Sequence, residues 1–146
     1  MIAEQTDGEV FEIVPVVPYP TSYEEMLSVS TREKDSNARP EIASAVDNWD
    51  DYDIVFLGYP IWHGDMPMIV YNFLESCDFS GKTVIHFNTH EGSGQSGTQS
   101  RIEAAIPTAT VLNGFAIRGA TAQNDTTSAK SAVERWITED LKDVLS

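Results

Sequence analysis

The chain has one cysteine, few basic residues and no long apolar run, and each of these shortages excludes a class of protein. The single cysteine, Cys77, cannot form an internal disulfide, so we expect a reducing, cytoplasmic setting. Nine basic residues against 23 acidic ones give a net charge of −14, which disfavours nucleic acid and favours basic partners. No apolar run approaches the roughly 20 residues of a membrane span. We therefore expect neither a membrane nor a nucleic-acid partner.

The order of apolar runs along the chain predicts an α/β fold. With 146 residues, 41% of them hydrophobic, the chain is long enough for one domain over residues 1–146 with a sizeable core. Strand-like and helix-like segments alternate, which is typical of a parallel sheet covered by helices on both faces. The expected strands are residues 10–14, 53–58, 83–87 and 109–114, the last extended to Arg118 past a glycine bulge. One expected helix starts at Tyr23, with Thr21 or Ser22 as its cap. The other expected helices cover residues 40–46, 68–76, 99–106 and 128–145, and a surface loop is expected at 28–40.

Residues 52–97 are the most informative part of the sequence. Residues 53–58 form a continuous apolar run, typical of a strand buried on both faces. This strand is followed by an aromatic loop at residues 59–67, and the next strand is followed by a glycine loop at residues 88–97. The carboxyl ends of neighbouring parallel strands lie at one edge of the sheet, where α/β proteins bind ligands. The two loops therefore predict a ligand site.

The aromatic loop contains Trp62 directly after the end of a predicted strand. Such a ring can stack on a planar ligand, or it can cover the apolar end of the sheet. Gly64 beside it permits close approach of the backbone to a ligand.

The glycine loop matches the spacing G-x-G-x-x-G from Gly92 to Gly97. The first glycine follows several residues after the predicted strand, and the next strand offers no acidic residue for a ribose, so a dinucleotide site is not favoured. Backbone N–H groups that bind an anion or a carbonyl are the preferred interpretation. The loop can also serve turn geometry alone.

Two catalytic alternatives rest on the same loops. His63, Asp65, His90 and Glu91 could converge on a metal, but neither loop shows a recognised ligand pattern. No serine lies in a G-x-S-x-G motif, so hydrolysis has no support. His86 occupies an alternating strand position and is predicted to be a hydrogen-bonded core or edge residue rather than a catalyst.

Three segments occur in the order YDIVFLGYPIW at 52–62, FSGKTV at 79–84 and THEGSG at 89–94. Together they resemble the flavodoxin-like fold, specifically the bacterial flavodoxin family of small FMN-binding proteins. The resemblance implies that the first loop lies against the isoalloxazine ring of FMN and that the second contacts its polar edge. The cofactor-binding residues that it implies are Pro60, Ile61, Trp62, His63, Gly64, Thr89, His90, Glu91, Gly92, Ser93 and Gly94.

The start of the chain departs from the family pattern. Members of the family begin with a hydrophobic strand and a Thr/Ser/Gly-rich loop that holds the FMN phosphate, and residues 1–8 resemble instead the end of the helix that follows this loop. The family's order places that strand between the segments at Val10 and Ile54. Three arrangements stay open: a chain without its natural beginning, direct pairing of the two flanking strands, or completion by a partner chain. A homodimer or a rearranged sheet is expected.

The resemblance implies an FMN-binding redox protein that transfers electrons or reduces a small acceptor such as a quinone, in the second case as an FMN-dependent oxidoreductase. An acidic surface suits a basic redox partner and disfavours the anionic reduced flavin. The alternative is a flavin-free scaffold or interaction module that keeps the fold and lacks the phosphate loop.

Overall fold

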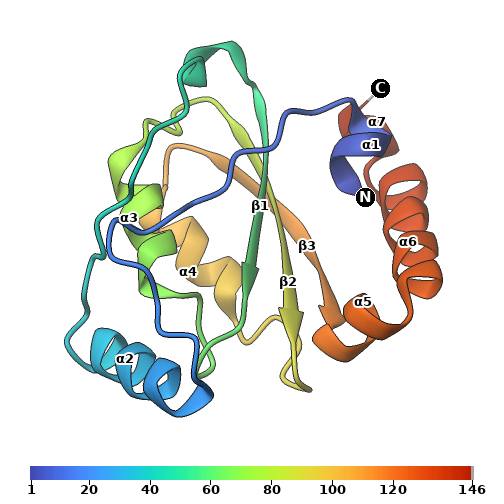
Figure 1. Ribbon diagram of the computed structural model, residues 1–146. Helices are drawn as coiled ribbons and strands as arrows, with labels where there is room; N and C mark the ends of the chain where they lie inside the picture. The colour runs from blue at the N-terminus through green and yellow to red at the C-terminus, as the bar shows by residue number, and fades with distance from the viewer. Residues whose placement is uncertain (146) are drawn as a thin grey trace.

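The computed structural model describes residues 1–145, and its centre is a parallel sheet of three strands (Figure 1). The strands are β1 (Ile54–Pro60), β2 (Thr83–His90) and β3 (Thr110–Arg118), in the order β1-β2-β3. All three coincide with predicted strands, and β1 and β2 run two and three residues further than predicted. Helices lie on both faces, which confirms the predicted three-layer α/β architecture.

A bulge in β3 lies opposite the middle of β2. Ile85 pairs with Leu112 and Phe87 with Phe115, so Asn113 and Gly114 together face the single residue between them on β2. The predicted glycine bulge is thereby confirmed. A Cβ atom at position 114 would lie 2.3 Å from the ring of His86, so only glycine fits there without displacing that ring.

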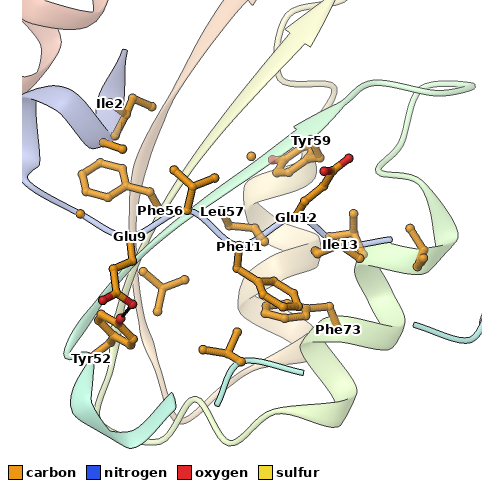
Figure 2. Close-up of a pocket in the computed structure, with 18 of the residues that line it drawn as sticks. Ile2, Glu9, Phe11, Glu12, Ile13, Tyr52, Phe56, Leu57, Tyr59 and Phe73 are labelled. Carbon is orange, nitrogen blue, oxygen red and sulfur yellow. Dashed lines mark hydrogen bonds between the residues drawn. The ribbon is translucent and has the colours of Figure 1, made fainter. Parts of the chain in front are cut away.

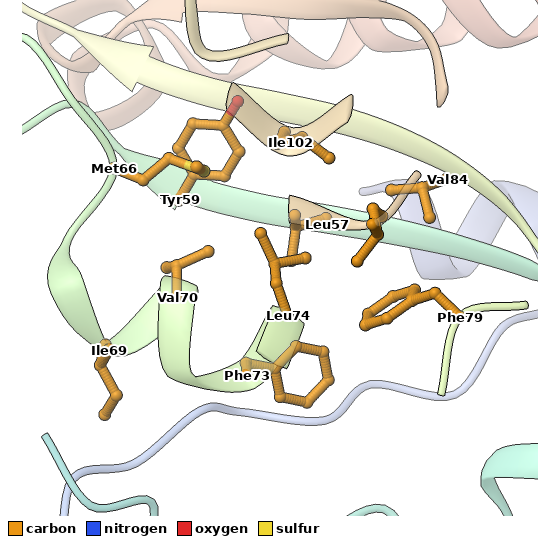
Figure 3. Packing of buried hydrophobic residues seen from close by; sticks show 11 residues of the cluster. Leu57, Tyr59, Met66, Ile69, Val70, Phe73, Leu74, Phe79, Val84 and Ile102 are labelled. Atoms are coloured by element: carbon orange, nitrogen blue, oxygen red, sulfur yellow. The ribbon is translucent and has the colours of Figure 1, made fainter. Parts of the chain in front are cut away.

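One face of the sheet is covered by α3 (Met68–Ser76) and α4 (Thr98–Ala105). Figure 3 shows the side chains of α3 converging on those of β1 and β2. The buried residues of this cluster are Leu57, Tyr59, Met66, Ile69, Val70, Phe73, Leu74, Phe79, Val84, Ile102 and Ile106.

The other face is covered by α1 (Ile2–Thr6), α5 (Gly119–Asn124) and α6 (Thr126–Arg135). The single helix predicted at 128–145 is wrong, because a π-helical turn, η2 (Trp136–Asp140), separates α6 from α7 (Lys142–Leu145). The N–H of Leu141 reaches the carbonyl of Trp136, at 3.2 Å. This wide turn keeps Trp136, Ile137 and Leu141 all buried against the sheet.

Helix α2 (Tyr23–Asp35) packs beside the aromatic loop and is longer than predicted. The hydroxyl of Ser22 caps it by accepting from the N–H of Glu25, at 3.2 Å, as expected. The surface loop predicted at 28–40 is helical up to Asp35, because contacts of Ser30 and Lys34 with His63 hold this polar segment in place. No helix among residues 1–145 has the length and apolar character to cross a bilayer.

The segment predicted as a first strand, 10–14, is not part of the sheet. Residues 9–15, here called the strap, cross over β1 in an extended conformation and lead to α2 (Figure 1). Phe11 stacks on Phe73 of α3, with 6.1 Å between ring centroids. Pro15 forms an isolated β-bridge with Ile42. The helix predicted at 40–46 is wrong, because this stretch is irregular and leads to the short 3-10 helix η1 (Trp49–Asp51). The strap does not pair with β1, so direct pairing of these two segments is not observed.

Candidate functional site

The two predicted loops lie side by side at the carboxyl edge of the sheet. Pro60 at the end of β1 is opposite Thr89 near the end of β2. The N–H of Ile61 then donates to the carbonyl of Thr89, at 2.9 Å. The predicted juxtaposition of the aromatic and glycine loops is therefore confirmed.

The aromatic loop begins with a tight turn at residues 62–65, here called the aromatic turn. Trp62 and Asp65 exchange backbone hydrogen bonds of 2.8 and 3.0 Å. The two central residues, His63 and Gly64, have φ of 52° and 73°, the combination of a type I′ turn. A non-glycine residue at positive φ is uncommon, so other contacts must hold His63 in this conformation.

Helix α2 holds the aromatic turn from one side. The Nε2 atom of His63 lies 2.8 Å from the hydroxyl of Ser30, and the ammonium group of Lys34 donates to the carbonyl of His63. These contacts explain the positive φ of His63, and they direct its ring toward α2.

Helices α4 and α3 hold the turn from the other side. The guanidinium group of Arg101 donates to the carbonyl of Gly64, at 2.9 Å, and lies 3.0 Å from a carboxylate oxygen of Asp65. The same oxygen accepts from the hydroxyl of Tyr71, at 2.7 Å. Burial, together with the Asp65 carboxylate, raises the pKa of Tyr71. The aromatic turn is thus rigidly placed before any ligand arrives.

Trp62 is half-buried and lines a large cavity beside β1. Its ring meets Tyr19 edge to face, with centroids 5.5 Å apart and planes at 89°. The hydroxyl of Tyr19 donates to Glu33, at 2.9 Å, and burial, together with the Glu33 carboxylate, raises the pKa of Tyr19. Sequence reasoning missed Tyr19, which lies between two prolines in what reads as a connecting segment.

The glycine loop is shaped by its own side chains. The N–H of Gly92 donates to Nδ1 of His90, at 2.9 Å, and the amide nitrogen of Asn88 donates to the carbonyl of Gly94, at 2.9 Å. Positive φ values at Gly92, Gly94, Ser96 and Gly97 let the backbone turn repeatedly before α4 begins. Glu91 and Ser93 lie exposed on this loop.

Asn88 leaves an unsatisfied acceptor below the glycine loop. Its side chain is 2% exposed, and its Oδ1 atom is buried with no hydrogen-bond partner among the described residues. An unpaired buried acceptor is costly. A water or a ligand with an N–H or O–H group would satisfy it.

Arg118 adds a cation to this edge of the sheet. It ends β3 opposite His90, and its guanidinium group lies 3.4 Å from the carbonyl of Glu91. The sequence placed Arg118 on the last strand but did not indicate its role. The available signal was topological, because the carboxyl end of a third parallel strand must lie at the same edge.

The structure does not bring the four metal-ligand candidates together. His63 and Asp65 contact α2 and Arg101, and His90 is bonded to Gly92. Among residues 1–145 no group of three or more histidine, cysteine or acidic side chains has the arrangement of a metal site.

His86 is a core residue, as predicted. Its ring is fully buried between the hydroxyl of Tyr59, at 3.1 Å from Nδ1, and the amide oxygen of Gln99, at 3.1 Å from Nε2. Burial lowers the pKa of His86, so the ring is neutral near pH 7. Tyr59 also lies 2.7 Å from the hydroxyl of Thr98, which ties the sheet to the start of α4 below the glycine loop.

Comparison with known proteins assigns the chain to a family. A family model described as Flavodoxin matches residues 1–139. Solved structures of inferred flavoproteins from Bacteroides uniformis and Bacteroides eggerthii are 30% and 28% identical, with TM-scores of 0.80 and 0.78. Each match covers 94% of this chain, and the matches cover 86% and 84% of those two chains.

A third solved structure is similar in fold only. It is a flavoprotein in complex with FMN from Lactobacillus acidophilus, 17% identical, with a TM-score of 0.61 over 86% of this chain and 88% of that chain. No curated protein matches the sequence significantly.

Proposed function

Because the chain belongs to the flavodoxin family, we propose that it binds FMN at the aromatic turn and the glycine loop and acts as a redox protein. The observation that carries the proposal is the Ile61–Thr89 hydrogen bond, which holds both loops at one edge of the sheet. The FMN complex of the Lactobacillus acidophilus protein supports the choice of flavin. The proposed contact residues are the eleven implied by the resemblance, with Tyr19, Asn88 and Arg118 added.

The residues present fit an isoalloxazine ring. Trp62 offers an aromatic face at the strand end, and Ser30, Lys34 and Arg101 fix the turn that carries it. The Oδ1 atom of Asn88 is an unpaired acceptor buried beneath the glycine loop, and it would accept from the single N–H group of the ring only after this loop opens. Backbone N–H groups of the glycine loop suit the carbonyl oxygens of the ring.

Bound FMN supplies the electron-transfer chemistry, and the protein binds it, orients it and sets its potential. The net charge of −14 disfavours adding electrons to the ring and therefore lowers the reduction potential. The same charge favours docking of a basic redox partner in a way that salt weakens. Electron transfer and reduction of a small acceptor such as a quinone are both compatible with this site, and the lone cysteine suits a cytoplasmic setting. A homodimer is part of the same proposal.

Flavin titration tests the proposal. We expect FMN fluorescence to be quenched on addition of the protein, and the Trp62→Leu variant to bind about tenfold more weakly because a stacking partner is lost. Tyr23→Leu is the matched control, since Tyr23 is an aromatic residue that is 80% exposed on α2. Equal loss of FMN affinity in both variants would show that Trp62 does not contact the flavin.

Riboflavin, which lacks the phosphate, shows which half of FMN is recognised. The proposed contacts address the ring, so riboflavin should bind within about threefold of FMN. A preference for FMN of about tenfold or more would reveal a phosphate site. Loss of this preference in Arg118→Ala would then locate the phosphate beside β3.

A flavin-free interaction module is the second candidate function. The edge of β1 without a strand neighbour among residues 1–145 favours it, because an unpaired strand edge is a ready surface for another polypeptide. Protein that is purified colourless and leaves FMN fluorescence unchanged would support this candidate and contradict the first.

A further inference from the structure

A chain of hydrogen-bond contacts, here called the relay, runs through the core beneath the glycine loop. Its members, in order, are Gln99, His86, Tyr59, Thr98 and Gln95. The amide oxygen of Gln99 lies 3.1 Å from Nε2 of His86, whose Nδ1 atom lies 3.1 Å from the hydroxyl of Tyr59. The hydroxyl of Thr98 lies 2.7 Å from that of Tyr59 and 2.7 Å from the carbonyl of Gln95. His86 and Thr98 are fully buried, so bulk water does not reach the centre of the relay.

The relay joins three elements of the fold. His86 comes from β2, Tyr59 from β1, and Thr98 is the first residue of α4. Figure 2 shows Tyr59 on the opposite face of β1 from Phe56, so its ring lies on the face that α3 and α4 cover. Gly114 of β3 lies against the His86 ring, where a Cβ atom would be only 2.3 Å away. The ring is therefore enclosed by the two neighbouring strands and by α4.

The side-chain amide of Gln99 fixes the direction of the relay at one end. Its Nε2 atom lies 3.2 Å from a carboxylate oxygen of Glu103 and 3.2 Å from the side-chain oxygen of Asn113. An ionised carboxylate only accepts hydrogen bonds, so the amide nitrogen of Gln99 faces Glu103 and its oxygen faces His86. Because an amide oxygen also only accepts, Nε2 of His86 carries a proton whether the ring is neutral or charged.

The relay contains one hydrogen bond more than a neutral His86 can supply. It begins and ends at carbonyl oxygens, and each of the four contacts between them needs one proton. A neutral imidazole ring, the hydroxyl of Tyr59 and the hydroxyl of Thr98 bring one proton each. A protonated ring brings a second, and all the contacts then become hydrogen bonds.

With a neutral ring, the missing hydrogen bond falls at the glycine loop. The unprotonated Nδ1 atom of His86 is a stronger base than a carbonyl oxygen, so it takes the proton of Tyr59. The hydroxyl of Thr98 then donates to Tyr59, because two hydroxyl oxygens 2.7 Å apart need a proton between them. The carbonyl of Gln95 keeps only the bond from the backbone N–H of Thr98, at 3.0 Å. With a protonated ring, the Thr98 hydroxyl donates to Gln95 instead.

This last hydrogen bond closes a turn of the glycine loop. Ser96 and Gly97 lie between Gln95 and Thr98 and have φ of 53° and 69°. A non-glycine residue at positive φ needs contacts that hold it there. The backbone N–H and the hydroxyl of Thr98 both reach the carbonyl of Gln95 across this turn. The second bond should therefore make the turn more rigid.

Few charged groups act on the His86 ring. Burial holds the pKa of His86 below its usual value, and the contacts with α4, including the charge of Glu103, oppose this shift. Tyr59 is the titratable group on β1, and Asp65 acts on Tyr59. Gly114, which lies against the ring from β3, carries no charge. The ring therefore takes up its proton in acidic solution.

We propose that His86 is a positioning residue for the glycine loop. When its ring takes up a proton from solvent, the relay reverses its direction, the hydroxyl of Thr98 donates to Gln95, and the loop is fixed. The consequence for binding rests on the proposed function, because a fixed loop should bind the flavin ring more tightly. We expect riboflavin to bind about threefold more tightly at about pH 5 than at about pH 8. Riboflavin is the probe because the phosphate of FMN itself titrates near about pH 6.

NMR of the full chain without flavin tests the relay itself. Between about pH 8 and about pH 5, we expect Nδ1 of His86 to gain a proton while Nε2 stays protonated. The backbone amide signal of Gly97 should titrate with the same midpoint. A ring that stays neutral over this range would overturn the proposal. A neutral ring that carries its proton on Nδ1 would also overturn it.

Three variants distinguish the relay from a direct effect of charge. Tyr59→Phe should leave the His86 ring able to titrate, but the amide of Gly97 should no longer follow it. Thr98→Val should uncouple the Gly97 amide in the same way, whereas Thr98→Ser keeps a hydroxyl and should retain the coupling. Unchanged coupling in Tyr59→Phe, or lost coupling in Thr98→Ser, would overturn the proposal.

Riboflavin titrations connect the relay to binding. The unmodified chain should show the threefold preference for about pH 5, and Tyr59→Phe should show none. His90 and Glu91 of the glycine loop are present in both proteins, so their own charges do not enter the comparison. An affinity that does not depend on pH, in a protein whose Gly97 amide follows His86, would overturn the link between the relay and binding. No binding of riboflavin at any pH, with this NMR coupling intact, would contradict the proposed flavin site and support the relay.

Discussion

The two sides of the sheet differ in how completely they are filled. On the β2–β3 side, Val84, Ile85 and His86 are fully buried, and β2 pairs with a strand along both of its edges. On the β1 side, the strand has one strand neighbour among residues 1–145, Gly58 and Pro60 are exposed, and a cavity separates the strand from the strap. The β2–β3 side, here called the closed side, is the better packed of the two, and the β1 side, here called the open side, ends in the aromatic turn that we propose contacts FMN. Stability and binding should therefore respond to mutations on opposite sides.

A matched pair of isoleucines gives the largest expected difference. Ile85 is fully buried on β2, whereas Ile54 is half-buried beside the cavity, and both belong to the core under α6. Ile85→Ala should lower the free energy of unfolding by about 3 kcal/mol, and Ile54→Ala by about 1 kcal/mol. Urea unfolding of the two variants measures the difference. Equal losses would show that the β1 side is as well packed as the other.

A matched pair of glycines should show a smaller difference. An ideal Cβ at Gly114 would lie 2.3 Å from His86, and one at Gly58 would lie 2.3 Å from Phe87. The His86 ring is fully buried and held by two hydrogen bonds, whereas the half-buried Phe87 ring can move away. Gly114→Ala should therefore cost about 2 kcal/mol and Gly58→Ala about 1 kcal/mol, measured by thermal or urea unfolding. The reverse order would mean that the β1 side is the more rigid one.

Arg101 should matter more for binding than for stability. Its ion pair with Asp65 joins a side chain that is 43% exposed to one that is 13% exposed, so its contribution to folding is at most about 1 kcal/mol. Arg101→Ala frees the aromatic turn, however, and should weaken FMN binding about fivefold. Glu103→Ala, on the same helix, is the control for helix stability. Full retention of FMN affinity in Arg101→Ala would show that the contacts of Arg101 with the aromatic turn do not preorganise Trp62.

The smallest effect is the pH dependence from His86 on the closed side. Burial lowers the pKa of His86, while its bond to Gln99 opposes this shift weakly. The unfolded chain therefore takes up a proton at higher pH than the folded chain does. The contribution of His86 to stability is complete above about pH 6.5 and is lost as the pH falls through its folded pKa. His86→Gln should show a shallower loss of stability below about pH 6.5, and an unchanged pH profile would contradict this role.

The sequence predicts the closed side better than the open one. Continuous apolar runs identify β1 and β2, and Gly114 marks the bulge, because burial on both faces leaves a local pattern. The strap has strand-like residues, but its position depends on contact of Phe11 with Phe73, which lies far along the chain. Local β propensity could not reveal this tertiary contact.

The residues of the candidate site also fall into a group that the sequence predicts and a group that it does not. Trp62 and the glycine loop were predictable because they follow strands in sequence. Arg118 could have been located from the topology of the third strand, whereas Tyr19 and Arg101 reach the loops from other elements and only the fold brings them there. The residues that could not be predicted are those whose approach depends on tertiary packing.

The most direct test is to map where FMN binds by NMR on isotope-labelled protein. We expect FMN to shift the indole N–H signal of Trp62 and the amide signals of Glu91, Gly92 and Gly94, while those of Ile54 and Phe56 stay in place. Shifts confined to the β1 edge, or no shifts at saturating FMN, would contradict it.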